Sequence, residues 1–291
     1  MVRADVGDGL SLIFRESEGG PWHYPSCRIQ KGLVLCCGDR ELVEEGTGFG
    51  VPLLRFGHET VFPGGARAAV ESRTNGDALG IRVDYELNLV ERMAAGGEII
   101  GGRMFYAAKE YLAGLHRRYP PLRGVGTWAS NGLRTVCRLG TRFETAATRG
   151  VVNVLYTIQR AGEGRGAVLH VVVNLGGIQR EGCTGIIIAN EQGANYFDRY
   201  RDSKQALVGR AIGTWDETQA DLASFVDSRD NIAFVLRRIE GARMFRGWER
   251  VENRLAWSGL SYVIPINTVS FDYDIQIGTP NDLRSARIPV F

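Results

Sequence analysis

Long apolar runs are missing from this sequence of 291 residues, in which no stretch approaches the roughly 18 apolar residues of a membrane-spanning helix. The first residues, MVRADVGDGLSLIF, lack the basic start, long apolar stretch and small-residue cleavage site of a secretory signal. Cysteine is scarce: five residues occur, and no two have C-x-x-C spacing, which argues against a disulfide framework and a zinc ribbon. We therefore expect a cytoplasmic protein with reduced cysteines and no membrane partner.

An excess of charge of either sign is also missing. Lysine and arginine total 35 and aspartate and glutamate total 33, so the formal net charge is only +2. A field this weak does not recruit nucleic acid, and we expect no nucleic-acid partner. Lysine occurs only at positions 31, 109 and 204, so arginine carries nearly all the positive charge.

Motifs for nucleotide or acyl chemistry are absent, including G-x-x-x-x-G-K-[ST] and G-x-S-x-G. The nearest match to a dinucleotide fingerprint, Gly162, Gly164 and Ala167, precedes the strand-like VLHVVVNLGG, so no helix N-terminus is predicted for a pyrophosphate. The four histidines show neither H-x-x-x-H nor H-x-H spacing. We predict no cofactor and no metal site.

Glycine, in contrast, is abundant. Its 38 residues are nearly twice the usual share of about 7%, which indicates many turns. A chain of 291 residues is near the upper limit for one hydrophobic core, but β-sandwiches reach this size undivided. We expect residues 1–291 to form a single β-rich domain.

Hairpin signals recur along the chain. Residues 51–56 are an apolar run, Gly57-His58 breaks it, and residues 59–62 resume with a β-branched and aromatic pair, the form of a tight hairpin. Asn75-Gly76 is the strongest turn signal, and residues 78–90 after it alternate between an apolar face, from Ile81 to Leu89, and a polar face. Further strands are predicted at 151–159, 167–175, 182–189, 231–239, 254–266 and 269–277.

Helical periodicity is limited to two segments. Apolar residues recur at three- and four-residue steps over 105–119, and Asp216 with Gln219 could cap a short helix that ends near Val226. Strand otherwise follows strand through short loops. We therefore predict a mainly β fold, either a large antiparallel two-sheet sandwich of the supersandwich kind or an open barrel, with one or two short helices.

Ionisable residues on the polar strand faces are the candidate site. Asp84 and Glu86 share a face with Arg82, and residues two apart on a strand lie roughly 6 to 7 Å apart, a spacing that suits a general acid and base across a sugar ring. Asp272 and Asp274 form a second such pair. His170, within an apolar run, is either a core histidine or an imidazole pointing into a pocket. The alternative for both carboxylate pairs is a solvated sheet face.

In its glycine-rich, aromatic, many-hairpin character the chain is similar to large β-sandwiches among carbohydrate-active and lipocalin-like proteins. The first hypothesis is therefore a lyase, hydrolase or isomerase that acts on a sugar or polyol at a concave sheet face. Its catalytic residues would be Asp84, Glu86 and His170, and its substrate-binding residues Arg55, Arg82, Trp128, Asp272 and Asp274. The alternative is a noncatalytic module that binds a sugar or apolar small molecule, or that forms a structural homo-oligomer. A pocket where ionisable groups converge favours the enzyme, and a large apolar interface favours the assembly.

Overall fold

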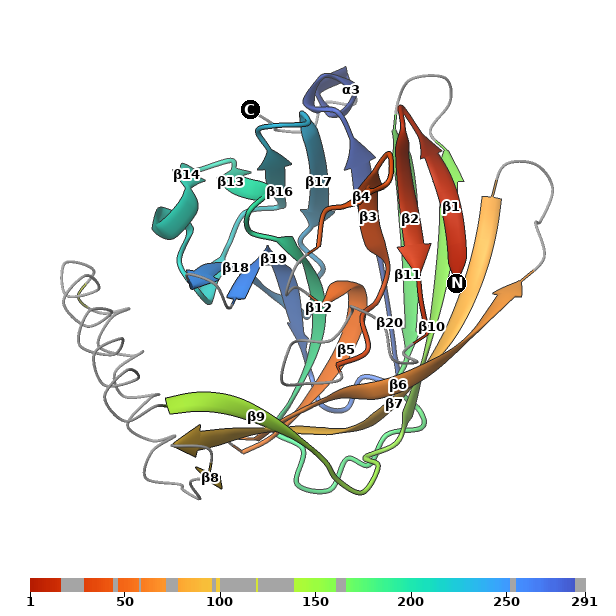
Figure 1. The fold of residues 1–291 in the computed structure, drawn as a ribbon, viewed down its shortest axis with the longest axis vertical. Helices are drawn as coiled ribbons and strands as arrows, with labels where there is room; N and C mark the ends of the chain where they lie inside the picture. The colour runs from red at the N-terminus through yellow and green to blue at the C-terminus, as the bar shows by residue number, and fades with distance from the viewer. Residues whose placement is uncertain are drawn as a thin grey trace.

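Antiparallel strands dominate the computed structural model (Figure 1). It describes residues 1–16, 29–43, 47–57, 59–71, 78–95, 98–99, 119, 139–160, 166–251 and 255–285. Within these residues the helices are the short 3-10 turn η2 (Gly209–Ile212) and the short α3 (Pro280–Ser285). No helix of the described chain is long and apolar enough to cross a membrane. The predicted fold class, mainly β with antiparallel sheets, is confirmed.

The described strands form two sheets. The smaller sheet has the order β1 (Val2–Gly7), β2 (Leu10–Phe14), β3 (Val34–Cys37) and β4 (Arg40–Glu41). The larger sheet begins with β14 (Ala206–Val208), β13 (Phe197–Asp202), β16 (Leu222–Asp227), β17 (Ile232–Arg237), β20 (Ser270–Gly278), β11 (Ala167–Asn174), β10 (Val151–Arg160) and β7 (Ala78–Ala95). It continues with β6 (Glu59–Glu71), β5 (Gly48–Phe56), β12 (Gly185–Gly193), β19 (Leu255–Ile264), β18 (Arg243–Val251) and β15 (Asp216–Thr218). The strands β8 (Glu98–Ile99) and β9 (Leu139–Thr145) pair with the second half of β7.

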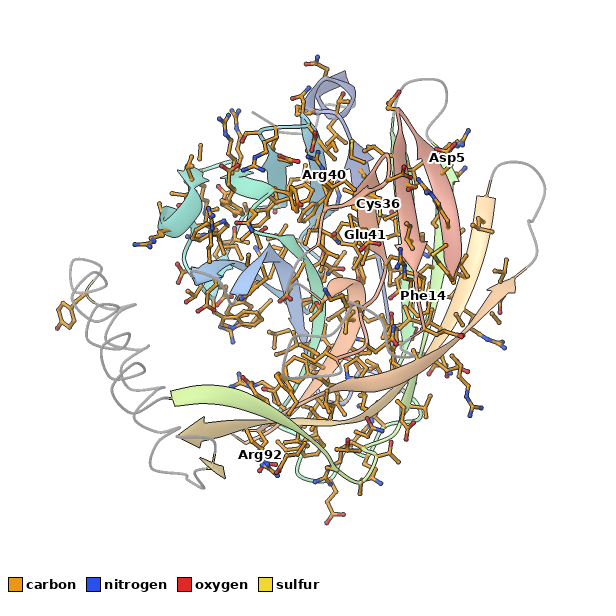
Figure 2. All side chains as sticks on the ribbon, viewed as in Figure 1. Asp5, Phe14, Cys36, Arg40, Glu41 and Arg92 are labelled. Carbon is orange, nitrogen blue, oxygen red and sulfur yellow. The ribbon has the colours of Figure 1, made fainter. Side chains whose placement is uncertain are left out.

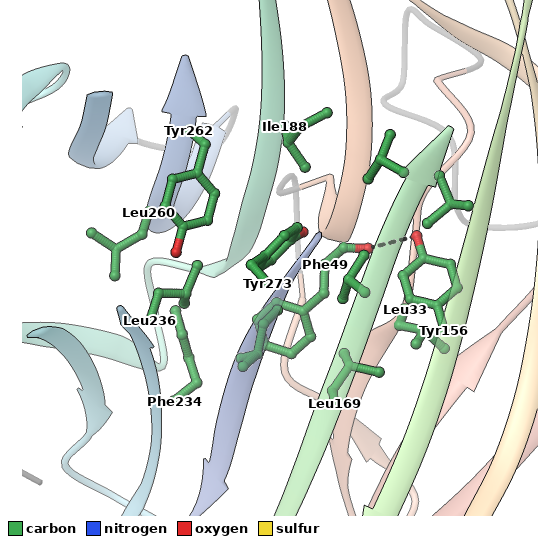
Figure 3. Packing of buried hydrophobic residues seen from close by; sticks show 14 of the residues in the cluster. Leu33, Phe49, Tyr156, Leu169, Ile188, Phe234, Leu236, Leu260, Tyr262 and Tyr273 are labelled. Atoms are coloured by element: carbon green, nitrogen blue, oxygen red, sulfur yellow. Dashed lines mark hydrogen bonds between the residues drawn. The ribbon is translucent and has the colours of Figure 1, made fainter. Parts of the chain in front are cut away.

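The larger sheet folds back on itself, so that its first and second halves form two packed layers (Figure 1). Aromatic side chains join the layers: the rings of Phe49 on β5 and Phe234 on β17 lie edge to face with centroids 5.2 Å apart. Tyr262 on β19 meets Tyr273 on β20 in the same way at 5.0 Å. Figure 3 shows these residues together in the core. The space between the layers is filled by buried side chains, and this interior packing is the main source of stability.

Buried tyrosines satisfy their hydroxyl groups inside this core. The Tyr156 hydroxyl donates to the carbonyl oxygen of Phe49 at 3.0 Å (Figure 3). It also lies 3.1 Å from the carbonyl oxygen of Gly50 and 2.8 Å from the Tyr85 hydroxyl. A Cβ atom on Gly50, which has φ 75°, would lie 2.6 Å from the Tyr156 ring. Glycine at this position therefore allows the Tyr156 hydroxyl to reach the β5 backbone.

Among the described residues, side chains and no strand ladder join the two ends of the larger sheet. Tyr200 on β13 and Thr218 on β15 both donate hydrogen bonds to Asp202 Oδ2, at 2.6 and 3.2 Å. Asp202 Oδ1 accepts the backbone N–H groups of Lys204 and Gln205 at 2.7 and 2.9 Å. The terminal strands β14 and β15 have three residues each, which leaves little edge for pairing with another chain.

The smaller sheet packs onto the open end of the two layers (Figure 2). Phe14 on β2 is fully buried and meets the ring of Tyr85 at 6.4 Å, edge to face. Leu35 on β3 donates its backbone N–H to the buried Gln192 Oε1 at 3.2 Å. Arg40 on β4 forms an ion pair with Asp230 in the β16–β17 turn, which ties the two sheets at the surface.

The predicted hairpins are confirmed by strand pairing: β5 with β6, β6 with β7, and β10 with β11. The turn residues Asn75 and Gly76 lie outside the described residues, as does the helix predicted at 105–119 except for Tyr119. The alternation predicted along β7 holds through Leu87 and then shifts, because Val90 and not Leu89 joins the core cluster.

The short helix predicted near 216–226 is wrong, because Asp216–Thr218 and Leu222–Asp227 are the strands β15 and β16. The β16 strand is covered on both faces: Phe225 lies in the main core, and Val226 packs with Leu283 of α3. A strand buried on both faces has no apolar alternation, so its spacing imitates a helix.

Candidate functional site

The predicted catalytic residues lie on one polar face, on the solvent side of the layer that contains β6, β7, β10, β11 and β20. Strand register forms cross-strand rows in which Asp84 pairs with Asn153, and His170 pairs with Asp274. Arg82 lies one row from Asp84, and Asp272 one row from Asp274. Six of the predicted residues therefore share one face: Arg82, Asp84, Glu86, His170, Asp272 and Asp274.

Contacts on this polar face are local and open to water. Asn153 donates to Asp84 Oδ1 at 2.6 Å, and His170 Nδ1 lies 2.7 Å from Asp274 Oδ1. His170 is neither a core histidine nor in a pocket, since 44% of its side chain is exposed. The residues directly before and after His170 in β11 face the core and are buried. The face points away from the core, as a solvated sheet face does.

The opposite layer presents a different surface, which we call the concave face. In Figure 1 this layer curves from β18 through β12 and β5 to β9, and both of its ends lie to the left of its middle strands. Its floor is a buried apolar cluster on the side away from the core: Val51, Leu53, Ile187 and Ala189. Phe62 and Trp215 pack against this floor and remain partly exposed.

Aromatic rings extend the concave face at both ends. Trp215 stacks on Phe245 of β18, with centroids 5.0 Å apart and an interplanar angle of 13°. At the other end Phe62 meets Phe143 of β9 edge to face at 5.4 Å. Rings of this kind offer large apolar area and can stack against the apolar side of a flat ligand.

Glu191 on β12 is the acidic residue at the centre of the concave face. Its neighbour Asn190 points into the core, where its Oδ1 accepts the Tyr273 hydroxyl at 2.8 Å. Successive strand residues point to opposite sides, so Glu191 points to the concave face. Its cross-strand partners are both glycines, Gly48 on β5 and Gly259 on β19. Neither partner carries a side chain, and backbone fills both positions: a Cβ atom would lie 2.8 Å from the Leu33 carbonyl oxygen at Gly48 and would collide with the Asn190 carbonyl oxygen at Gly259.

One oxygen of this carboxyl group is held in place. Thr47 donates to Glu191 Oε2 from its backbone N–H at 3.3 Å and from its Oγ1 at 3.0 Å. In the part of the chain that the structure describes, Oε1 has no hydrogen-bond partner. Burial raises the pKa of Glu191, and the two Thr47 hydrogen bonds offset only part of that effect.

Trp257 lies on the far side of the side-chain-free position at Gly259. Its ring occupies the space above Gly247 on β18, where any larger residue would collide with it. Its Nε1 donates to Glu249 Oε2 at 3.4 Å. The order across this face is therefore Glu191 on β12, the Trp257 ring on β19 and Glu249 on β18.

The raised pKa of a second acid, Asp227, is explained by local structure. Burial, followed by the neighbouring Asp230, raises the pKa of Asp227 to about 6. Asp227 Oδ1 accepts the backbone N–H of Arg229 at 2.8 Å within the β16–β17 turn, and Asp230 is paired with Arg40. This cluster closes a turn and is paired with the Arg40 guanidinium, so Glu191 is the stronger candidate.

Of the predicted binding residues, one lies on the concave face. Arg55 follows Val51 and Leu53 at two-residue steps on β5 and so shares their side. Trp128 lies outside the described residues. The candidates predicted from sequence do not include Glu191, Trp257 and Glu249, although the polar trio Asn190, Glu191 and Gln192, which directly follows five buried residues, is a usable signal.

No group of three or more histidine, cysteine or acidic side chains in the described chain is arranged to hold a metal ion. Comparison with known proteins adds no assignment. No family model, curated protein or solved structure matches this chain. The concave face is therefore interpreted from its own chemistry.

Proposed function

We propose that the protein binds a sugar or similar polyol on the concave face. The observation that carries this proposal is that the Glu191 carboxyl group and the partly exposed Trp257 ring share one face on the adjacent strands β12 and β19. A pyranose ring has an apolar side that stacks on an indole and hydroxyl groups at its edge that bond to a carboxyl group. Glu191 Oε1 and the ring of Trp257 supply these two contacts.

The packed interior supports an external site. The largest side chains between the layers, such as Tyr156 and Phe234, are fully buried, so the space that holds a ligand in lipocalin-like barrels is filled here. The polar face with Asp84 and His170 lacks aromatic side chains among its described residues, and its charged groups are solvated. The concave face offers both stacking and hydrogen bonding.

Glycan-array screening followed by calorimetry tests this proposal. Trp257→Ala is expected to weaken binding of the best array sugar by about tenfold or more, the equivalent of about 1.4 kcal/mol. Glu191→Gln preserves the shape of the side chain and should also weaken binding, because an amide replaces the carboxyl group that bonds to the sugar hydroxyls. Val208→Ala, at an exposed residue of the remote edge strand β14, is the control and should bind like the unchanged protein.

Two outcomes contradict the proposal. One is an array without any sugar bound above background. The other is a bound sugar whose affinity is unchanged in both variants, with melting temperatures that show both to be folded. Loss of affinity on changing Asp84 to Asn instead would place the binding site on the polar face.

A further inference from the structure

We propose that the concave face hydrolyses glycosidic bonds, with Glu191 as general acid and Glu249 as general base. The inference rests on the proposed sugar binding and adds a reaction to it. Its geometric basis is that the two glutamates share one sheet face with the same indole: Glu191 pairs with Gly259, two residues from Trp257 on β19, and Glu249 accepts the Trp257 Nε1–H at 3.4 Å. A sugar stacked on Trp257 would have a carboxyl group at each side.

Glu191 is suited to donate a proton. Both Thr47 donors bind the same oxygen, Oε2, so a proton on the carboxyl group resides on Oε1, the oxygen without a protein partner in the described chain. Burial raises the pKa of this group, which keeps a larger fraction protonated near neutral pH. Glu249 is partly exposed, and its hydrogen bond from an indole N–H requires an acceptor oxygen, so it is suited to take a proton from water.

The reaction balances without a cofactor. As the bond between the anomeric carbon and the glycosidic oxygen breaks, Glu191 transfers its Oε1 proton to that oxygen, which leaves as an alcohol. A water molecule gives one proton to Glu249, and its oxygen bonds to the anomeric carbon to form the hemiacetal. Exchange with solvent returns one proton to Glu191 and removes one from Glu249.

Strand spacing predicts the stereochemical course. The strands β12 and β18 are separated by β19, and Glu249 lies two residues along from the row of Glu191, so at about 4.8 Å per strand and about 3.3 Å per residue their backbones lie about 12 Å apart. Direct attack by a carboxylate requires carboxyl groups about 5 Å apart, whereas attack by an intervening water suits a separation of about 6.5 to 9.5 Å. We therefore expect the anomeric configuration to invert.

A panel of p-nitrophenyl glycosides and the matching unactivated disaccharides tests the proposal. The unchanged protein should release sugar from at least one pair, and proton NMR should show the inverted anomer first. Glu191→Gln should lower kcat about 100-fold or more on the disaccharide and much less on the p-nitrophenyl glycoside, whose leaving group departs without protonation. Glu249→Gln should lower both rates. If the substitutions acted only by disturbing the structure, each variant would lose the same factor in kcat on both substrates.

Glu240→Gln, at an exposed residue of the β17–β18 turn, is the matched control and should retain full activity. Sugars that bind but remain intact across the whole panel would overturn the hydrolysis inference and leave the proposed binding in place. Retention of the anomeric configuration, or full activity in Glu191→Gln with loss in Glu86→Gln, would overturn it as well. Absence of both binding and hydrolysis would remove the proposed function too.

Discussion

Single glycines decide where the chain can pack most closely. Gly50 combines a left-handed backbone, with φ 75°, and a missing side chain at the point where Tyr156 reaches the β5 carbonyls. Gly9 has nearly the same backbone, with φ 72°, but nothing lies within 4 Å of where its Cβ atom would be. Substitutions at Gly9 and Gly50 can therefore be compared to separate the free energy lost to backbone strain from that lost with a core contact.

Gly9→Ala should lower the free energy of unfolding by roughly 1 to 2 kcal/mol, the cost of alanine in a left-handed conformation. Gly50→Ala should cost roughly 2 kcal/mol more, because Tyr156 must also move and lose buried hydrogen bonds. Urea denaturation of both variants measures the difference. Equal losses would show that the approach of Tyr156 to β5 does not contribute to stability.

Residue identity alone could not select the site. Asp84, Glu86 and Asp274 attract attention because alternation places them visibly on polar strand faces, and the strand register does bring several of them together. Glu191, the acid of the proposed site, is inconspicuous in sequence, because its cross-strand partners, Gly48 and Gly259, lie on two other strands. Those neighbours are distant in the chain, and only strand order brings them beside it.

At the scale of elements, the two ends of the larger sheet meet through Asp202. Hydrogen bonds from Tyr200, from the Lys204 and Gln205 backbone and from the Gln205 side chain outweigh the effect of burial and lower the pKa of Asp202 below its ordinary value. A carboxylate with a lowered pKa stabilises the fold above the pKa it has in the unfolded chain. That stabilisation is lost as the pH falls through the lowered value.

Asp202→Asn should therefore lower the free energy of unfolding by about 2 kcal/mol at pH 7, since the amide presents hydrogens to donors that need an acceptor. The difference from the unchanged protein should stay constant from about pH 5 to pH 8 and shrink below about pH 4, where Asp202 becomes protonated in the unfolded chain. Melting temperatures across this range measure it. Asp221→Asn, at an exposed loop residue, is the control. A difference that grows toward acid pH would contradict the role of Asp202.

Strand elements were predictable where one face is wet. The β10 and β11 strands alternate in burial along their length, and their pairing follows the prediction from sequence. The β16 strand is buried on both faces, so its sequence carries no two-residue period and its apolar spacing predicts a helix instead. The β12 strand is also buried on both faces, but its run of isoleucines still predicts a strand.

At the scale of the whole molecule, the sequence predicts the fold class but not how the larger sheet curves into two layers. Hairpin signals fix which strands pair in sequence, whereas the neighbours β5 and β12, or β11 and β20, are joined by long connections that no turn signal predicts. These pairings set the two layers and decide which side of each is turned outward. The prediction of a concave functional face survives as a proposal, but on the layer of β12 and β19.

The central claim, that ligand binds the concave face, is tested most directly by photoaffinity labelling. A diazirine derivative of the sugar selected on the array is photolysed with the protein, and the labelled peptides are mapped by mass spectrometry. We predict adducts in the peptides that cover Gly185–Gly193 and Leu255–Ile264, suppressed by an excess of the unmodified sugar. Suppressible adducts confined to Ala78–Ala95 and Ser270–Gly278, the strands of the polar face, would contradict it.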